Sequence, residues 1–129
     1  MLKHNLENIV DEVRNKRLRE KGGGHLVDDP GVLLLAECQQ NSRALSEELA
    51  ERDLTHTVVR GAIKDKFKPD EEPSSFADAK KLGLVHYWIE CQGYVCEIAS
   101  ESQRHFGEAI VLAERPGNYI VFDDSFDHA

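Results

Sequence analysis

The fold of this chain is decided by one stretch, HYWIECQGYVCEIA at residues 86–99. Two runs rich in aromatic and β-branched residues, 86–91 and 94–99, flank the dipeptide Gln92-Gly93. A two-residue connection that contains glycine is typical of a tight hairpin turn, because glycine adopts positive φ without steric cost. The stretch therefore predicts an antiparallel β-hairpin.

This turn sets which residues face each other across the hairpin. Outward from it, Trp88 faces Glu97, and His86 faces Ala99. Because side chains alternate along a strand, His86 and Glu97 lie on one face as diagonal neighbours within reach of each other. A carboxylate there could accept a hydrogen bond from the imidazole Nδ1–H and fix its tautomer. The same face is predicted to hold Trp88, Glu90, Val95 and Ala99.

Two segments ahead of the hairpin predict helices. The first covers residues 1–22, where the other face is charged and the glycines at 22–24 end the helix. Its apolar residues recur at i, i+3, i+4 and i+7: Leu6, Ile9, Val10 and Val13.

The second predicted helix begins near residue 30, where Pro30 suits a first turn, and runs to about Arg52. Cys38 is expected inside this helix, two turns from its start, and it points toward the core. If the helix covers the His86 face of the hairpin, Cys38 meets His86; the pattern leaves that face open. One stripe carries Leu34, Cys38, Ser42, Leu45 and Leu49.

The remaining segments complete a small sheet. The charged, proline-bearing run 62–74 predicts a long loop, and 75–82 predicts a short helix. The order predicts an α+β fold in a single domain over residues 1–129, with N-terminal helices packed on an antiparallel sheet. Further strands are predicted at 55–60, 110–112 and 118–122, and an acidic tail begins at Asp123.

Composition restricts the function classes. A formal net charge of −8 argues against binding to nucleic-acid phosphates. The three cysteines form no CxxC pair and no even disulfide framework, which predicts a reducing, cytoplasmic compartment. No apolar run is long enough to cross a bilayer, so no membrane association is expected. These features do not predict the oligomeric state.

The candidate chemistry comes from Cys38, His86 and Glu97, in that order along the chain. A cysteine on a helix, facing a base and its orienting acid on adjacent strands, is the arrangement that nucleophilic catalysis requires. Backbone N–H groups near Cys38, or the side chain of Gln39, are the candidates for stabilising an oxyanion. Glu90 shares the face of His86 and is a rival for the orienting role.

The ordered pattern resembles the transglutaminase-like branch of the papain-like cysteine-enzyme superfamily, in particular small members related to lasso-peptide maturation proteases. The likeness covers roughly residues 34–99. Its matching elements are the helix that carries Cys38, the segment TVVRG at 57–61, and the strand blocks HYWIE at 86–90 and GYVCE at 93–97.

The resemblance implies a papain-like fold in which Cys38 is the nucleophile, His86 the base and Glu97 the orienting acid. It implies a hydrolase or acyl transferase that acts on amide or ester bonds, with a peptide or protein substrate and no cofactor. The chain departs from the family in two ways. Glu97 stands where Asp or Asn is usual, and the helix is expected to begin before Cys38 rather than at it.

Other interpretations remain open at this point. Cys38 could be a buried structural thiol, and the domain a non-catalytic member of the same fold that binds or regulates another protein. A metal site needs three or four convergent ligands, which Cys38, His86, Cys91, Cys96 and His105 could supply in part. Alternation points Cys91 and Cys96 away from His86, so no metal is expected.

Overall fold

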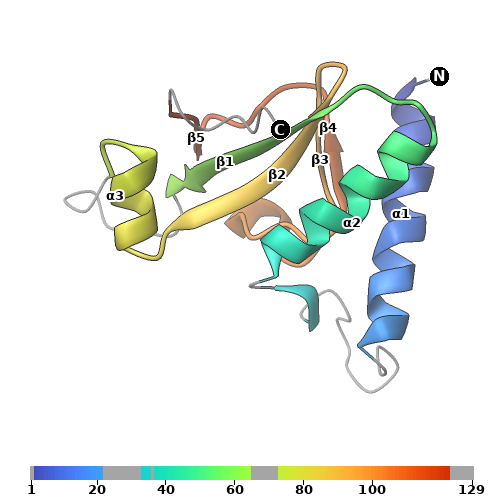
Figure 1. Ribbon diagram of the computed structural model, residues 1–129, viewed down its shortest axis with the longest axis horizontal. Helices are drawn as coiled ribbons and strands as arrows, with labels where there is room; N and C mark the ends of the chain where they lie inside the picture. Colours follow the sequence, from blue (N-terminus) through green and yellow to red (C-terminus); the bar gives the residue numbers. More distant parts are fainter. Residues whose placement is uncertain (1, 22–32, 36, 65–72, 123–129) are drawn as a thin grey trace.

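The computed structural model describes residues 2–21, 33–35, 37–64 and 73–122. Figure 1 shows a curled antiparallel sheet with two long helices side by side at one end and a short helix at the other. The sheet has five strands in the order β4-β3-β2-β1-β5. The predicted α+β class is therefore confirmed. The elements are α1 (Leu2–Glu20), α2 (Cys38–Glu51), β1 (Thr57–Ile63), α3 (Phe76–Lys81), β2 (Val85–Cys91), β3 (Tyr94–Glu97), the 3-10 turn η5 (Gln103–His105), β4 (Ile110–Leu112) and β5 (Tyr119–Ile120).

The central hairpin forms in the predicted register. Cys91 pairs with Tyr94 in the β2–β3 ladder. Both turn residues have positive φ, 51° at Gln92 and 93° at Gly93, which is the geometry of a type I′ turn. The strand β3 ends at Glu97, however, and the predicted pairing of His86 with Ala99 is not made. His86 instead pairs with Gly61 of β1 on its other side.

The two faces of the sheet are covered differently. On one face, the apolar stripes of α1 and α2 pack against Ile89, Cys91 and Cys96. On the other face, a smaller cluster lies around Trp88 and Tyr119. The helices therefore cover the face opposite to His86. The helix-side core consists of Leu6, Ile9, Val10, Val13, Leu34, Leu45, Leu49, Ile89, Cys91, Cys96, Ile98, Ala99 and Val111.

The predicted start of the second helix is wrong. Residues 33 and 34 have 3-10 geometry, Glu37 is the N-cap, and α2 begins at Cys38. The amide of Glu37 donates to the carbonyl of Leu34 over 3.4 Å, so the chain turns there instead of continuing one α-helix. Residues 28–32, where the earlier start was expected, lie outside the described residues, as do the glycines at 22–24.

Other boundaries differ from expectation by a few residues. The strand β1 starts two residues late and runs to Ile63, so the predicted loop 62–74 is wrong at its beginning. Ala62 pairs with both Val85 and Ile120, which keeps the end of β1 inside the sheet. The short predicted helix is α3, whose N-cap Ser75 accepts a hydrogen bond from the amide of Asp78. Residues 65–72 and 123–129 lie outside the described part.

Strands β1 and β5 approach each other closely at Gly61. A Cβ built on Gly61 would lie 2.2 Å from the carbonyl oxygen of Ile120 and 2.5 Å from the Trp88 ring. Only glycine leaves room for both neighbours at this position. Within the described residues, no helix combines the length and apolar character needed to cross a membrane.

Candidate active site around Cys38, His86 and Glu97

Cys38 occupies the first residue of α2, and the start of this helix is anchored on α1. The Glu37 carboxylate forms ion pairs with Arg17 and Lys21. Asn41, one turn into the helix, donates from Nδ2 to the carbonyl of Leu34 over 2.9 Å. These contacts fix where the helix begins and so where the half-buried Cys38 thiol lies.

Cys38 lies among the first backbone N–H groups of α2. The first N–H groups of an α-helix have no acceptor within the helix, and they sum with the peptide dipoles to a partial positive charge. Cys38 starts its helix, as the nucleophile of the resembled family usually does. The departure from the family pattern expected at Cys38 is therefore absent.

His86 is held rigidly on the opposite face of the sheet. Its side chain is buried, with 1% of its surface exposed. The ring stacks on Trp88 at a centroid distance of 5.8 Å and meets Tyr119 edge-on at 6.1 Å. Packing on both sides of the ring leaves it one orientation.

Glu97 contacts the His86 ring, as the hairpin register predicted, but through the other nitrogen. Its Oε1 makes a hydrogen bond with Nε2 of His86, not with Nδ1. Its Oε2 accepts a hydrogen bond from the hydroxyl of Tyr119. Tyr119 was not among the predicted site residues. Its place in a last strand gave no sign that the hydroxyl would reach Glu97.

The three predicted residues come together despite the helices lying on the other face. One ligand atom each from Cys38, His86 and a further residue, Glu101, lie within 4.8 Å of one another. Because Glu97 takes Nε2, the ring nitrogen left for the thiol is Nδ1. The sequence left open which face the helix covers and linked this meeting to a helix over the His86 face; the helices cover the opposite face, and Cys38 and His86 still lie together.

Glu101 is the site residue that the sequence analysis missed. It is 7% exposed, and its Oε2 lies 3.3 Å from Nδ1 of His86. That contact is not aligned as a hydrogen bond, and Nδ1 has no hydrogen-bond partner among the described residues. The only sign of Glu101 in the sequence was that a carboxylate follows Glu97 by four residues. The bend that turns it inward could not be read from the pattern.

The segment that carries Glu101 is clamped by α1. Arg14 donates from one guanidinium nitrogen to the carbonyls of Ile98 and Gly107, over 2.6 and 2.8 Å. Within the segment, the amide of Ser100 donates to the carbonyl of Glu108 over 2.8 Å. The loop after β3 is therefore closed on itself and fixed in place.

The electrostatics of this pocket favour a positive ring. Burial by itself would lower the pKa of His86, because it disfavours the charged form. The nearby charge of Glu97 opposes this effect, and the contacts with Cys38 and Glu101 and the hydrogen bond with Glu97 add to the opposition. The pKa of His86 lies well above its ordinary value as a result.

Glu90, the rival for the orienting role, is engaged elsewhere. Its carboxylate accepts from the Trp88 indole over 2.9 Å and from two nitrogens of Arg115 over 2.8 Å each. Burial would raise the pKa of Glu90, but the hydrogen bonds from Arg115 and Trp88 and the charge of Arg115 lower it. Glu90 therefore joins Trp88 to the loop before β5 and does not touch His86.

The other candidate ligands do not join the site. Cys91 and Cys96 are buried on the helix side of the sheet, as alternation predicted. Burial, with the charges of Cys91 and Glu97 adding to it, raises the pKa of Cys96 to about 12. His105 lies 3.7 Å from Glu108 and is not part of the cluster around His86.

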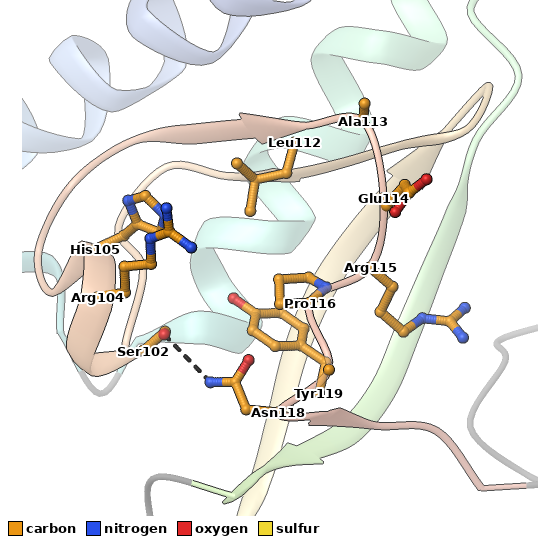
Figure 2. Close-up of a pocket in the computed structure, with 11 residues that line it drawn as sticks. Ser102, Arg104, His105, Leu112, Ala113, Glu114, Arg115, Pro116, Asn118 and Tyr119 are labelled. Carbon is orange, nitrogen blue, oxygen red and sulfur yellow. Dashed lines mark hydrogen bonds between the residues drawn. The ribbon is translucent and has the colours of Figure 1, made fainter.

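A large pocket lies beside the site, on the face of the sheet that the helices leave open (Figure 2). It has a volume of about 1010 Å³ and is bordered by the η5 turn, the end of β4 and the loop 113–118. Tyr119 forms part of the pocket wall, and its hydroxyl donates a hydrogen bond to Glu97. Asn118 and Ser102 close one side through a 3.3 Å hydrogen bond. The space beside Cys38 itself is far smaller, about 10 Å³.

No family model, no curated protein and no solved structure matches the chain.

Proposed function

We propose that this protein is a thiol-dependent hydrolase or acyl transferase that acts on amide or ester bonds through Cys38, His86 and Glu97. One observation carries the proposal: a cysteine at the first residue of a helix lies beside a buried histidine whose far nitrogen is held by a glutamate. Each part of a thiol triad has a residue in the required relation to the next.

The chemistry follows from these positions. Nδ1 of His86 takes the thiol proton of Cys38, and the thiolate sulfur attacks the substrate carbonyl. The oxygen of the tetrahedral intermediate lies near the free N–H groups at the start of α2, which stabilise its negative charge. As the intermediate collapses, the leaving amine or alcohol takes the proton from His86 and a thioester remains on Cys38. Water, activated by the same ring, then releases the acyl group.

Glu97 and Tyr119 support the ring during these steps. The carboxylate of Glu97 holds Nε2–H and so fixes the tautomer that leaves Nδ1 facing the thiol. It also balances the charge of the imidazolium. Tyr119 donates to the second oxygen of Glu97 and keeps the carboxylate from rotating away. Tyr119 is a positioning residue because it acts through Glu97.

The relation of elements supports a papain-like, transglutaminase-like domain. In that arrangement the nucleophile starts a helix, the histidine opens a strand, and the acid lies on the adjacent strand. Here Cys38 starts α2, His86 is the second residue of β2, and Glu97 ends β3. Glutamate instead of the usual Asp or Asn adds one methylene. This length suits the diagonal contact that Glu97 makes across the hairpin.

The substrate class we propose is a peptide or protein. Hydrolysis is favoured over transfer, because no feature of the described residues marks a site for a second amine. The small space beside Cys38 requires the substrate carbonyl to approach along the exposed side of the thiol.

A second candidate function is a non-catalytic member of the same fold that binds or regulates another protein. The burial of His86 and the narrow space at Cys38 favour it. The two functions differ in the reactivity of one thiol, because only the enzyme needs Cys38 to be activated by His86.

Iodoacetamide labelling at neutral pH, followed by peptide mapping, separates them. The enzyme predicts that Cys38 is alkylated well before Cys91 and Cys96, and that His86→Ala slows this reaction. Cys96→Ser serves as the matched control, since it removes a buried thiol on the other face of the sheet. Equal labelling of all three cysteines, with no change in His86→Ala, would reject the enzyme and favour the non-catalytic binding domain.

A further inference from the structure

We propose that Cys38, His86 and Glu101 form a binding site for a thiophilic divalent cation, with zinc as the best match. The sulfur, one ring nitrogen and one carboxylate oxygen already lie within 4.8 Å of one another. This inference does not depend on catalysis, because Cys38 acts here as a metal ligand and not as a nucleophile. It also uses Glu101, which has no role in the proposed acyl chemistry.

The donor set is one that zinc prefers. Zinc binds cysteine sulfur, histidine nitrogen and carboxylate oxygen, and sites with three protein ligands keep a fourth position for water or another small ligand. A tetrahedral zinc would hold its sulfur and nitrogen ligands about 3.5 Å apart. The ligand atoms of the cluster lie within 4.8 Å of one another, and Oε2 of Glu101 lies 3.3 Å from Nδ1 of His86, so the cluster is close to the size that one ion requires.

An independent observation points to a ligand at this place. Nδ1 of His86 is buried and has no hydrogen-bond partner among the described residues. It faces Glu101, whose Oε2 lies 3.3 Å away without the alignment of a hydrogen bond. A buried ring nitrogen left in this way is costly unless something binds it. A cation between the three residues would satisfy it.

The surroundings supply the outer support that metal-binding histidines usually have. Such a histidine commonly donates its second N–H to a carboxylate, which fixes its orientation. Here Glu97 holds Nε2, and Tyr119 in turn holds Glu97. Glu101 is placed by the loop that Arg14 clamps. The ligands are thus positioned by groups that do not themselves contact the cation.

Charge balance also favours a doubly positive ion. With a thiolate at Cys38, a carboxylate at Glu101 and a neutral ring at His86, the three ligands carry two negative charges. A divalent cation cancels them in a buried site, where uncompensated charge is expensive. Binding releases the thiol proton and any proton on the ring to solvent, so uptake is accompanied by proton release.

Zinc and acyl chemistry exclude each other at Cys38. A sulfur bound to zinc cannot attack a carbonyl or an alkylating agent while the metal stays in place. Zinc is therefore expected to protect Cys38 from iodoacetamide, and a chelator is expected to restore labelling.

The test is a zinc titration of the full chain, first treated with a chelator and then competed against a zinc-sensitive dye. One ion per chain is expected, and cobalt in its place should show a thiolate-to-metal charge-transfer band. Cys38→Ser should abolish that band. Glu101→Gln should weaken zinc binding about tenfold or more, as lost ligand support does in metal sites. Glu108→Gln is the matched control, because this nearby carboxylate is 66% exposed and outside the cluster.

Three results would overturn the site: no stoichiometric binding at micromolar zinc, equal affinities in Glu101→Gln and Glu108→Gln, or a cobalt band that survives in Cys38→Ser. Circular dichroism of each variant checks that the fold is kept. Iodoacetamide labelling in chelator reports on the thiol alone. Selective labelling without zinc binding rejects the cation site and not the enzyme, whereas zinc binding without selective labelling rejects the enzyme and not the cation site.

Discussion

Glu97 holds His86 by Nε2, across the hairpin and one strand away. This contact decides which ring nitrogen faces Cys38, because only Nδ1 remains. It also places a negative charge behind the ring, which is the largest of the effects that raise the pKa of His86 against burial. The reactivity of Cys38 is therefore expected to depend on a residue that the thiol does not touch.

Glu97→Gln keeps the size of the side chain and removes its charge. Hydrogen bonds to charged groups contribute about 1.5–3 kcal/mol, so the alkylation rate of Cys38 is expected to fall by about tenfold or more. The rate of iodoacetamide labelling, followed by mass spectrometry, measures this. Glu90→Gln is the control, since Glu90 lies on the same face but binds Arg115. Equal rates in the two variants would remove Glu97 from the orienting role.

Tyr119→Phe removes one hydroxyl and keeps the ring that packs on His86 and Trp88. It leaves an oxygen of Glu97 without its donor, which is expected to lower the free energy of unfolding by about 1–3 kcal/mol. Cys38 labelling should slow, by less than in Glu97→Gln, because the carboxylate keeps its charge. Urea unfolding and labelling kinetics on one preparation check both effects. A faster labelling rate than in the wild type would show that Tyr119 restrains the site instead of positioning it.

The ion pair of Glu90 with Arg115 predicts a pH-dependent contribution to stability. The pKa of Glu90 is lowered in the folded protein, mainly by hydrogen bonds from Arg115 and Trp88 that outweigh burial. Its stabilisation is therefore fully present above the ordinary glutamate pKa and is lost as the pH falls through the lowered folded value. Glu90→Gln should cost about 0.5–1 kcal/mol at neutral pH, since the pair is partly screened by solvent.

Urea midpoints of wild type and Glu90→Gln, measured from neutral to acid pH, give the sign of this effect. The difference between the two proteins should shrink as the pH falls. A difference that grew in acid would contradict the direction of the Glu90 pKa shift.

Gly61→Ala is expected to destabilise the sheet by roughly 1–3 kcal/mol, because its Cβ would collide with the carbonyl of Ile120 and the Trp88 ring. Gly117→Ala is the matched control, since a Cβ there meets nothing within 4 Å. Thermal melts of the two variants make the comparison. Similar melting temperatures would mean that β5 is free to move away from β1.

The hairpin could be predicted from the sequence because its determinants are local. The turn Gln92-Gly93 fixes the register, and the register places His86 and Glu97 as diagonal neighbours. The α+β class followed from the order of helical and strand-like segments. These features depend on residues close together in the chain.

The start of α2 could not be predicted in this way. The run 32–37 has an apolar pattern that fits a helix, but Glu37 forms ion pairs with Arg17 of α1 and with Lys21, which follows α1 directly. That tertiary contact and the turn at Leu34 begin the helix at Cys38. A helix that begins at Cys38 supports the interpretation of this residue as a nucleophile, although the local sequence pattern predicted an earlier start.

The position of Glu101 beside His86 could not be predicted from the sequence either. Alternation was extended to Ala99, whereas β3 ends at Glu97 and Ala99 packs on the helix side. The bend beyond Glu97 turns Glu101 toward His86. It is held by Arg14, more than 80 residues away in the chain, and no short-range rule would reveal that contact.

The central claim, that Cys38 is a nucleophile activated by His86, is tested most directly by acyl trapping with p-nitrophenyl acetate. Rapid mixing should give a burst of p-nitrophenolate and an acetyl adduct on Cys38 by peptide mapping. Cys38→Ser, which should remain folded at a cost of about 1–2 kcal/mol, should lose both signals. An acetyl adduct spread over Cys91 and Cys96, or a burst that persists in Cys38→Ser, would contradict the account.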